Sequence, residues 1–164
     1  MYEEGPFFIT GIQYYVAGRL ATISGFMPVC GNLLHHAVEF FLKEFLSSSM
    51  SLPALKNLNH NLKRIWEEYK KKNAGQELGY FDPLISELHK FESLRYPPWP
   101  AGKVAQISVS KPEIIEINDF ELVLEDVDRL VSVIAKPKKG WKEIEKSLHK
   151  EAARFLLAAN KHLI

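Results

Sequence analysis

The sequence contains one cysteine among 164 residues, so no disulfide can form within the chain. This thiol, Cys30, stands beside Gly31 in an apolar stretch, and we interpret it as a small hydrophobic residue of a protein from a reducing compartment. An excess of charge of either sign is also lacking, because the formal net charge is +1. This balance argues against a protein that binds polyanions over its whole surface, although it allows a local basic patch.

Long hydrophobic runs are missing as well. The most apolar window, 29–46, contains Glu39 and Lys43, which the hydrocarbon core of a membrane would exclude. The first residues include Glu3 and Glu4 and have no basic start, so they do not resemble a secretory signal. We therefore expect a cytoplasmic protein without a membrane segment.

The motifs that mark common catalytic and cofactor sites are absent. The chain has no G-x-S-x-G, no glycine-rich phosphate-binding loop and no H-E-x-x-H. No Glu is followed three residues later by a His, which is the spacing that di-iron bundles use. His35 and Glu39, like Glu145 and His149, stand four residues apart and could share a ligand sphere, but we predict no metal and no cofactor.

Apolar residues recur with a helical period of 3.6 over most of the chain, and prolines and glycines separate the periodic segments. Between 103 and 118 the pattern changes to alternation, which predicts a β-hairpin or a pair of extended segments. We therefore predict a mainly α protein, with one domain over 1–164. It would form an up-and-down helical bundle of five to six helices with a small extended or β-hairpin insertion near 103–118. The predicted helices cover about 7–24, 29–47, 54–73, 82–95, 120–135 and 141–162.

Four polar residues, Asn32, His36, Glu39 and Lys43, form one line on the predicted second helix. They stand at i, i+4, i+7 and i+11, and the rest of this helix is apolar on two ridges. The line is either a narrow solvent-exposed face with a routine ion pair, or a site in a groove of the bundle. Such a site could be a hydrogen-bonded network, an anion pocket or an acid–base pair.

Three further residues could contribute to a site. Arg95 and Tyr96 end the predicted fourth helix before a run of prolines, and they could hold a phosphate or stack on a base. Alternatively, Arg95 only stabilises the negative end of the helix. His60 lies between leucines of the predicted third helix, where packing or capping is the alternative to catalysis.

The last predicted helix has a basic outer side. Eight basic residues and three acids lie between Lys136 and Lys161, whereas 113–128 has seven acids and no base. This side could contact nucleic acid, but the two segments could also compensate each other in space, and a solvated face is our default interpretation.

The order and spacing of four short segments resemble those of HEPN-domain proteins. The segments are 13–19 (QYYVAGR), 37–43 (AVE-x-x-LK), 60–62 (HNL) and 94–97 (LRYP). The resemblance covers about residues 8–100 and, more loosely, the last two predicted helices. It implies an up-and-down helical bundle that commonly dimerises.

The family includes metal-independent ribonucleases, toxins paired with nucleotidyltransferases, and members with no known activity. Its nuclease signature is an Arg followed by a His with four to six residues between them. None of the five arginines of this chain meets that spacing, since the nearest case, Arg154 to His162, is too long.

The resemblance and the missing signature together predict a non-catalytic HEPN-like binding module that acts as a homodimer. Its ligand would be a nucleotide, RNA or a protein partner. The alternatives are a divergent metal-independent ribonuclease with His36 or His60 as the base, and a toxin-type partner of a nucleotidyltransferase. The residues expected to bind the ligand are Asn32, His36, Glu39, Lys43, His60, Arg95 and Tyr96.

Overall fold

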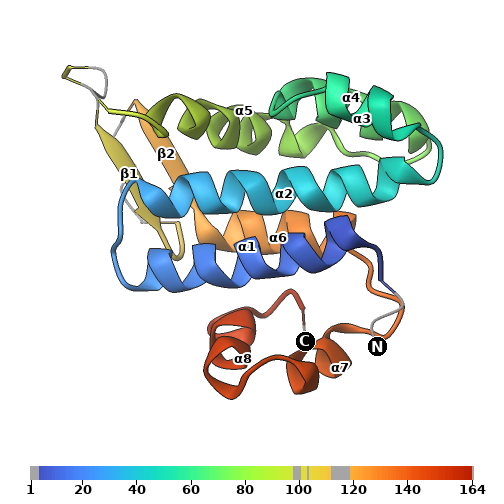
Figure 1. Ribbon diagram of the computed structural model, residues 1–164. Helices are drawn as coiled ribbons and strands as arrows, with labels where there is room; N and C mark the ends of the chain where they lie inside the picture. Colours follow the sequence, from blue (N-terminus) through green and yellow to red (C-terminus); the bar gives the residue numbers. More distant parts are fainter. Residues whose placement is uncertain (1–3, 98–100, 103, 112–118, 164) are drawn as a thin grey trace.

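The computed structural model describes residues 4–97, 101–102, 104–111 and 119–163. Over these residues the protein is mainly helical, as predicted, with eight α-helices, two 3-10 turns and one two-stranded sheet (Figure 1). The α-helices are α1 (Pro6–Ile23), α2 (Val29–Ser47), α3 (Leu52–Asn57), α4 (Leu62–Lys72), α5 (Asp82–Lys90), α6 (Leu124–Ile134), α7 (Trp141–Ser147) and α8 (Lys150–Leu157). The 3-10 turns are η1 (Gly79–Phe81) and η2 (Phe91–Leu94), and the strands are β1 (Ala105–Ser108) and β2 (Phe120–Val123).

Helix α2 lies at the centre of the molecule and contacts most of the other elements (Figure 1). Helix α1 runs antiparallel beside it, and α6 lies behind the pair. Helices α3, α4 and α5 cover the side of α2 that faces away from α1, and α7 and α8 lie beyond α1. Among the described residues, no helix combines the length and the apolar character needed to cross a membrane.

The first two predicted helices are confirmed with nearly the predicted bounds. They approach closely because glycines of α1 face large side chains of α2. A Cβ added to Gly18 would lie 2.7 Å from a methyl carbon of Leu34, and one added to Gly11 would lie 2.8 Å from the ring of Phe41. Leu34, Val38 and Phe41 of α2 are buried as a result, and they belong to the core.

The prediction of a single third helix over 54–73 is wrong, because this segment forms two helices, α3 and α4, separated by a turn over 58–61. Asn59 adopts a left-handed conformation with φ of 50°, which an α-helix cannot contain. Asn61 then caps α4 by accepting a hydrogen bond from the Arg64 N–H at 3.2 Å. His60 therefore lies in a turn and not on a helix.

The predicted last helix is also two helices. Helix α7 ends before Leu148, and His149 begins α8 by accepting a hydrogen bond from the Glu151 N–H at 3.4 Å. The predicted fourth helix, 82–95, corresponds in the structure to α5 followed directly by the tighter turn η2.

The first extended segment of the predicted insertion is present as β1, but its described partner is β2, which follows the insertion and pairs with β1 in parallel. Their register runs from Ala105 opposite Phe120 to Ser108 opposite Val123. Residues 120–123 were predicted to open a helix, but they form β2 and only Leu124 begins α6. The second predicted extended segment, 114–117, lies outside the described residues.

A buried polar network joins α1 to α6 and α8. The Arg19 side chain is fully buried, and its guanidinium pairs with the Asp128 carboxylate and donates through Nε to the Phe155 carbonyl at 2.7 Å. The Tyr15 hydroxyl donates to Asp128 at 2.6 Å and accepts from Asn160 Nδ2 at 2.8 Å. Every charge in this network therefore has a partner, which a buried ion pair requires.

We expect Arg19→Met to lower the free energy of unfolding by about 3–5 kcal/mol, because it leaves the buried Asp128 charge without its partner. Chemical denaturation by urea measures this change. Arg154→Met is the matched control, since its pair with Glu151 is 70% and 62% exposed and its loss should change the stability little. Equal effects of the two substitutions would contradict the prediction.

Candidate functional site

The polar line on α2 does not form a solvent-exposed face. Glu39 is 1% exposed, and His36 and Lys43 are each 8% exposed. Asn32 is half-buried, and its Oδ1 has no hydrogen-bond partner among the described residues. Lys43 and Glu39 contact the turn over 58–61, and His36 faces Glu92 of η2, so these three polar groups are enclosed by protein.

The Glu39 carboxylate is the centre of the site. Lys43 Nζ donates to Oε1 at 2.6 Å, and His60 Nδ1 lies 3.1 and 3.2 Å from the two carboxylate oxygens. His36 Nδ1 lies 3.3 Å from Oε2. We call these four residues, Glu39, Lys43, His36 and His60, the Glu39 cluster.

Local structure explains why His60 reaches a residue of α2. Its turn is held by Lys43, whose ammonium donates to the Asn59 carbonyl at 2.8 Å as well as to Glu39. The left-handed Asn59 then directs the next residue back toward α2. The His60 side chain stays 50% exposed, so one edge of its ring contacts the carboxylate while the other faces solvent.

The pKa of Glu39 shows that the carboxylate is ionised. Burial alone would raise this pKa, but hydrogen bonds from His36, Lys43 and His60, together with the Lys43 charge, lower it to about 2. An ionised carboxylate can only accept hydrogen bonds, so each imidazole must present a protonated Nδ1 to it. Both rings are thereby oriented with Nε2 on the side away from Glu39.

The aromatic ring of Tyr14 closes one side of this arrangement. Its ring centroid lies 5.3 Å from that of His36 and 5.5 Å from that of Phe40, which places a flat apolar wall beside the imidazole. The second imidazole, of His60, lies 5.4 Å from His36 in an edge-to-face arrangement. The two rings are therefore neighbours with fixed orientations.

Arg95 and Tyr96 are connected to the Glu39 cluster through a residue that the sequence analysis did not select. Arg95 Nη1 donates to Glu92 Oε1 at 3.2 Å, and the other oxygen of Glu92 lies 3.9 Å from His36 Nε2. Tyr96 is 72% exposed and contacts the guanidinium of Arg95, which lies 5.5 Å from its ring centroid. Arg95 therefore lies at the outer edge of the site.

Sequence reasoning missed Glu92 and considered His35 only as a possible metal ligand together with Glu39. His35 is fully buried, and its Nε2 lies 3.7 Å from Glu39 and 3.8 Å from Glu92. One signal was available, because Glu92 stands three residues before Arg95 and so falls on the same side of a helical turn. Nothing in the sequence showed that this turn packs against α2.

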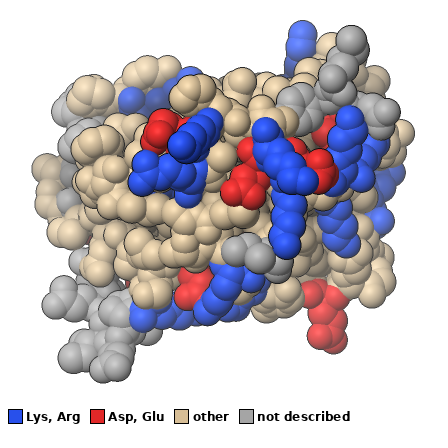
Figure 2. Space-filling view, turned by 90° about the horizontal axis from the view of Figure 1, so that it is seen from below, with Lys and Arg blue, Asp and Glu red and all other residues tan. Residues whose placement is uncertain are grey.

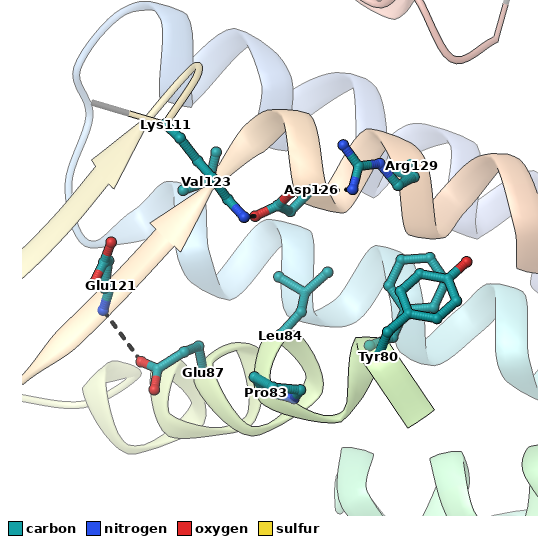
Figure 3. A pocket seen from close by; sticks show the side chains of 10 residues that line it. Tyr80, Pro83, Leu84, Glu87, Lys111, Glu121, Val123, Asp126 and Arg129 are labelled. Carbon is teal, nitrogen blue, oxygen red and sulfur yellow. Dashed lines mark hydrogen bonds and ion pairs between the residues drawn. The ribbon is translucent and has the colours of Figure 1, made fainter. Parts of the chain in front are cut away.

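A cavity of about 390 Å³ lies between α5, β2 and α6 (Figure 3). Most of its charged side chains already have partners. Asp126 pairs with Lys111 at 3.4 Å and with Arg129 at 3.9 Å, and Glu87 accepts the Glu121 N–H at 3.2 Å. Because both of its basic side chains pair with Asp126, this cavity offers an anionic ligand less than the Glu39 cluster does.

The basic side of the last predicted helix is also compensated. Figure 2 views the molecule from the side of α7 and α8, and acidic side chains lie next to basic ones on this face. The pairs include Lys146 with Glu143 at 2.7 Å and Lys161 with Glu125 at 2.6 Å. This pairing agrees with a solvated face, and the acidic segment 113–128 supplies one of the partners.

Comparisons of this chain with protein-family models, with curated proteins and with solved structures find no match.

We expect Glu39→Gln to lower the free energy of unfolding at pH 7 by about 3 kcal/mol, because a pKa of about 2 rather than 4.5 stabilises the folded state by that amount. The contribution is fully present above pH 4.5 and is lost as the pH falls toward 2. The wild type and the variant should therefore converge on acidification, which urea denaturation between pH 7 and pH 3 measures. A constant difference over this range would show that the Glu39 charge does not stabilise the fold.

Proposed function

We propose that the protein is a HEPN-like binding module, built as a helical bundle, that holds a phosphate group of a nucleotide or of RNA at the outer edge of the Glu39 cluster. The observation that carries this proposal is the half-exposed His60 imidazole, anchored through Nδ1 on the ionised Glu39. Its Nε2 faces outward and can donate to a phosphate oxygen when the ring is protonated.

The charges around this position support an anionic ligand. Lys43 and Arg95 balance Glu39 and Glu92, so each proton taken up by an imidazole adds a net positive charge to the site. Arg95 uses Nη1 to bond to Glu92 and is 39% exposed, which leaves its planar group accessible for a phosphate. A site with fixed donors and little surplus negative charge suits phosphate better than a cationic ligand.

Tyr96 supports a nucleotide over inorganic phosphate. Its ring is 72% exposed and lies next to the guanidinium that would contact the phosphate. Base-on-aromatic stacking contributes roughly 1–3 kcal/mol per base and tolerates any sequence. The pair of Arg95 and Tyr96 would therefore bind one phosphate and one base of a single strand.

We expect the wild type to bind a short fluorescent single-stranded RNA in a buffer that contains EDTA, with an affinity that falls as salt is added. Arg95→Gln and His60→Gln should each weaken binding by about tenfold or more, since a charge-assisted hydrogen bond contributes roughly 1.5–3 kcal/mol. Fluorescence anisotropy measures the dissociation constants. Unlabelled mononucleotides, the second proposed class of ligand, are then tested as competitors of the RNA.

Arg154→Gln is the control for this titration, because Arg154 is an exposed arginine of α8 that also pairs with a Glu three residues away. Its affinity should equal that of the wild type. Binding that is absent in the wild type, or that is the same in all four proteins, would refute the proposed site.

A divergent ribonuclease is the second candidate, and one observation favours it. His36 and His60 are both held through Nδ1 by one carboxylate, with ring centroids 5.4 Å apart, so two imidazoles could act as base and acid. Separating the RNA from the same titrations on a denaturing gel tests this candidate. Cleavage by the wild type that is lost in His60→Gln would replace the non-catalytic proposal, and intact RNA would leave it in place.

The proposal includes a homodimer, as the family resemblance implies. The end of α1, the turn that follows it and the first residue of α2 expose large apolar side chains that a second copy could cover, and exposed apolar surface is typical of an interface. The exposed fractions are 38% for Leu20, 42% for Ile23, 62% for Phe26, 39% for Met27 and 55% for Val29.

We expect light scattering after gel filtration to give twice the chain mass of 18.8 kDa for the wild type. Phe26→Glu should return the mass to that of one chain, because it places a charge in the middle of the apolar patch. Leu52→Glu is the control, since Leu52 is 54% exposed on α3 at the opposite end of α2. A monomeric wild type would contradict the dimer.

A further inference from the structure

His35 is a buried side chain with one unsatisfied nitrogen. The ring is fully buried, and Nδ1 lies 2.9 Å from the Leu88 carbonyl oxygen, which can only accept, so Nδ1 carries a hydrogen. The neutral ring then presents a lone pair at Nε2, and this atom has no hydrogen-bond partner among the described residues. A buried polar atom without a partner requires a specific explanation.

The surroundings of this nitrogen are acceptors. Nε2 of His35 lies 3.7 Å from Glu39 Oε2 and 3.8 Å from Glu92 Oε2, and the Glu92 oxygen is itself buried and without a hydrogen-bond partner. Three electron-rich atoms therefore converge on one small space. In a medium of low dielectric constant this arrangement is unfavourable unless a cation lies between the atoms.

A proton on His35 Nε2 would be a poor choice for this cation. The distances of 3.7 and 3.8 Å are too long for a hydrogen bond, so a hydrogen on Nε2 would reach neither carboxylate well. A larger cation fits the gap better.

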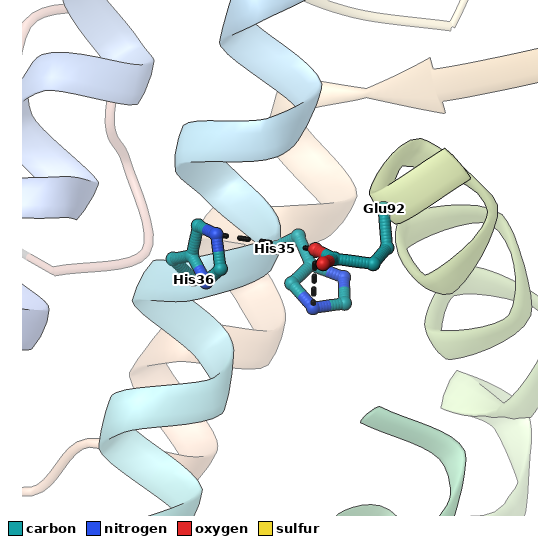
Figure 4. A group of neighbouring side chains, drawn as sticks. All are labelled: His35, His36 and Glu92. Atoms are coloured by element: carbon teal, nitrogen blue, oxygen red, sulfur yellow. Dashed lines mark ion pairs between the residues drawn. The ribbon is translucent and has the colours of Figure 1, made fainter. Parts of the chain in front are cut away.

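We propose that His35 Nε2, His36 Nε2 and Glu92 Oε2 bind one divalent transition-metal ion, with Zn²⁺ as the reference ion. The three atoms lie within 4.8 Å of one another, and Figure 4 shows the ion-pair contacts from the Glu92 carboxylate of η2 to both imidazoles of α2. Zinc forms bonds of roughly 2.0–2.2 Å, which places tetrahedral ligand atoms about 3.3–3.5 Å apart. The distances of 3.8 and 3.9 Å to Glu92 would contract by a few tenths of an ångström.

The outer partners of the three ligands match those of metal-bound residues. The Leu88 carbonyl holds Nδ1 of His35, Glu39 holds Nδ1 of His36 at 3.3 Å, and Arg95 holds the second oxygen of Glu92 at 3.2 Å. Metal-ligating histidines nearly always donate the other ring N–H to a carbonyl or carboxylate, which fixes the tautomer that coordinates. Each ligand is therefore oriented before the ion arrives.

The donor set indicates which ions bind. Two imidazoles and one carboxylate favour zinc and other late first-row metals, whereas magnesium and calcium prefer oxygen ligands only. Three protein ligands leave one tetrahedral position for water. Side-chain exposures of 11% for His36 and 27% for Glu92 give the ion a route from solvent.

The experiment uses the full chain, freed of metal with EDTA and dialysed, and titrated with Zn²⁺ at pH 7.5 in a calorimeter without any RNA. We expect one ion per chain, and replacement of zinc by Co²⁺ should give the visible absorption of a four-coordinate site. Zinc should also raise the melting temperature of the wild type.

Variants separate this site from its neighbours. Glu92→Gln should weaken zinc binding by more than 100-fold, because it removes a ligand, and Arg95→Gln by about 10-fold, because it removes an outer partner. His60→Gln is the matched control, since His60 belongs to the Glu39 cluster but not to the three ligands, and it should bind zinc as the wild type does.

Several outcomes would overturn the proposal: no zinc binding by the wild type, equal affinity in Glu92→Gln, or a loss of affinity in His60→Gln alone. Circular dichroism of each variant shows whether it is folded, and Arg95→Gln tests the site with only an exposed residue changed. The proposal does not rest on phosphate binding, because the zinc titration contains no RNA and the RNA titration contains EDTA.

Discussion

The burial of one carboxylate, that of Glu39, is the constraint on which the rest of the site depends. An unpaired charge at a position that is 1% exposed costs several kcal/mol, so the surrounding chain must supply donors. Lys43 supplies one from the next turn of α2, and it also bonds to the Asn59 carbonyl. The position of the turn between α3 and α4 therefore depends on the Glu39 charge, and this turn places His60 beside the carboxylate.

The sequence predicts the helices well where one periodic pattern corresponds to one element. Helices α1 and α2 have long apolar ridges that end at glycine, proline or serine, and their predicted bounds agree with the structure. The break at Asn59 was missed because the apolar spacing from Leu55 to Leu62 continues through it. A short strand such as β2 was missed because four residues with three buried positions fit either period.

The candidate site also has a part that the sequence predicts and a part that it does not. The line from His36 to Lys43 was predictable, because residues on one helix have a fixed geometry. Contacts between different elements were not predictable from the sequence. Glu92, for example, reaches His35 and His36 only because η2 packs against α2. The protonated Nδ1 of His35 likewise depends on the Leu88 carbonyl of α5, for which the sequence of α2 contains no signal.

The two proposed ligands would influence each other through His36. A metal ion bound at its Nε2 adds positive charge on the side of the ring that faces Glu92, and the neighbouring His60 ring lies 5.4 Å away. This charge would strengthen the binding of an anion at His60, and thermodynamic linkage then requires that the anion strengthen metal binding by the same factor. The ionised Glu39, which holds both imidazoles, limits the size of this coupling because it screens one ring from the other. The carboxylate that organises the site would thus also determine how strongly its two halves interact.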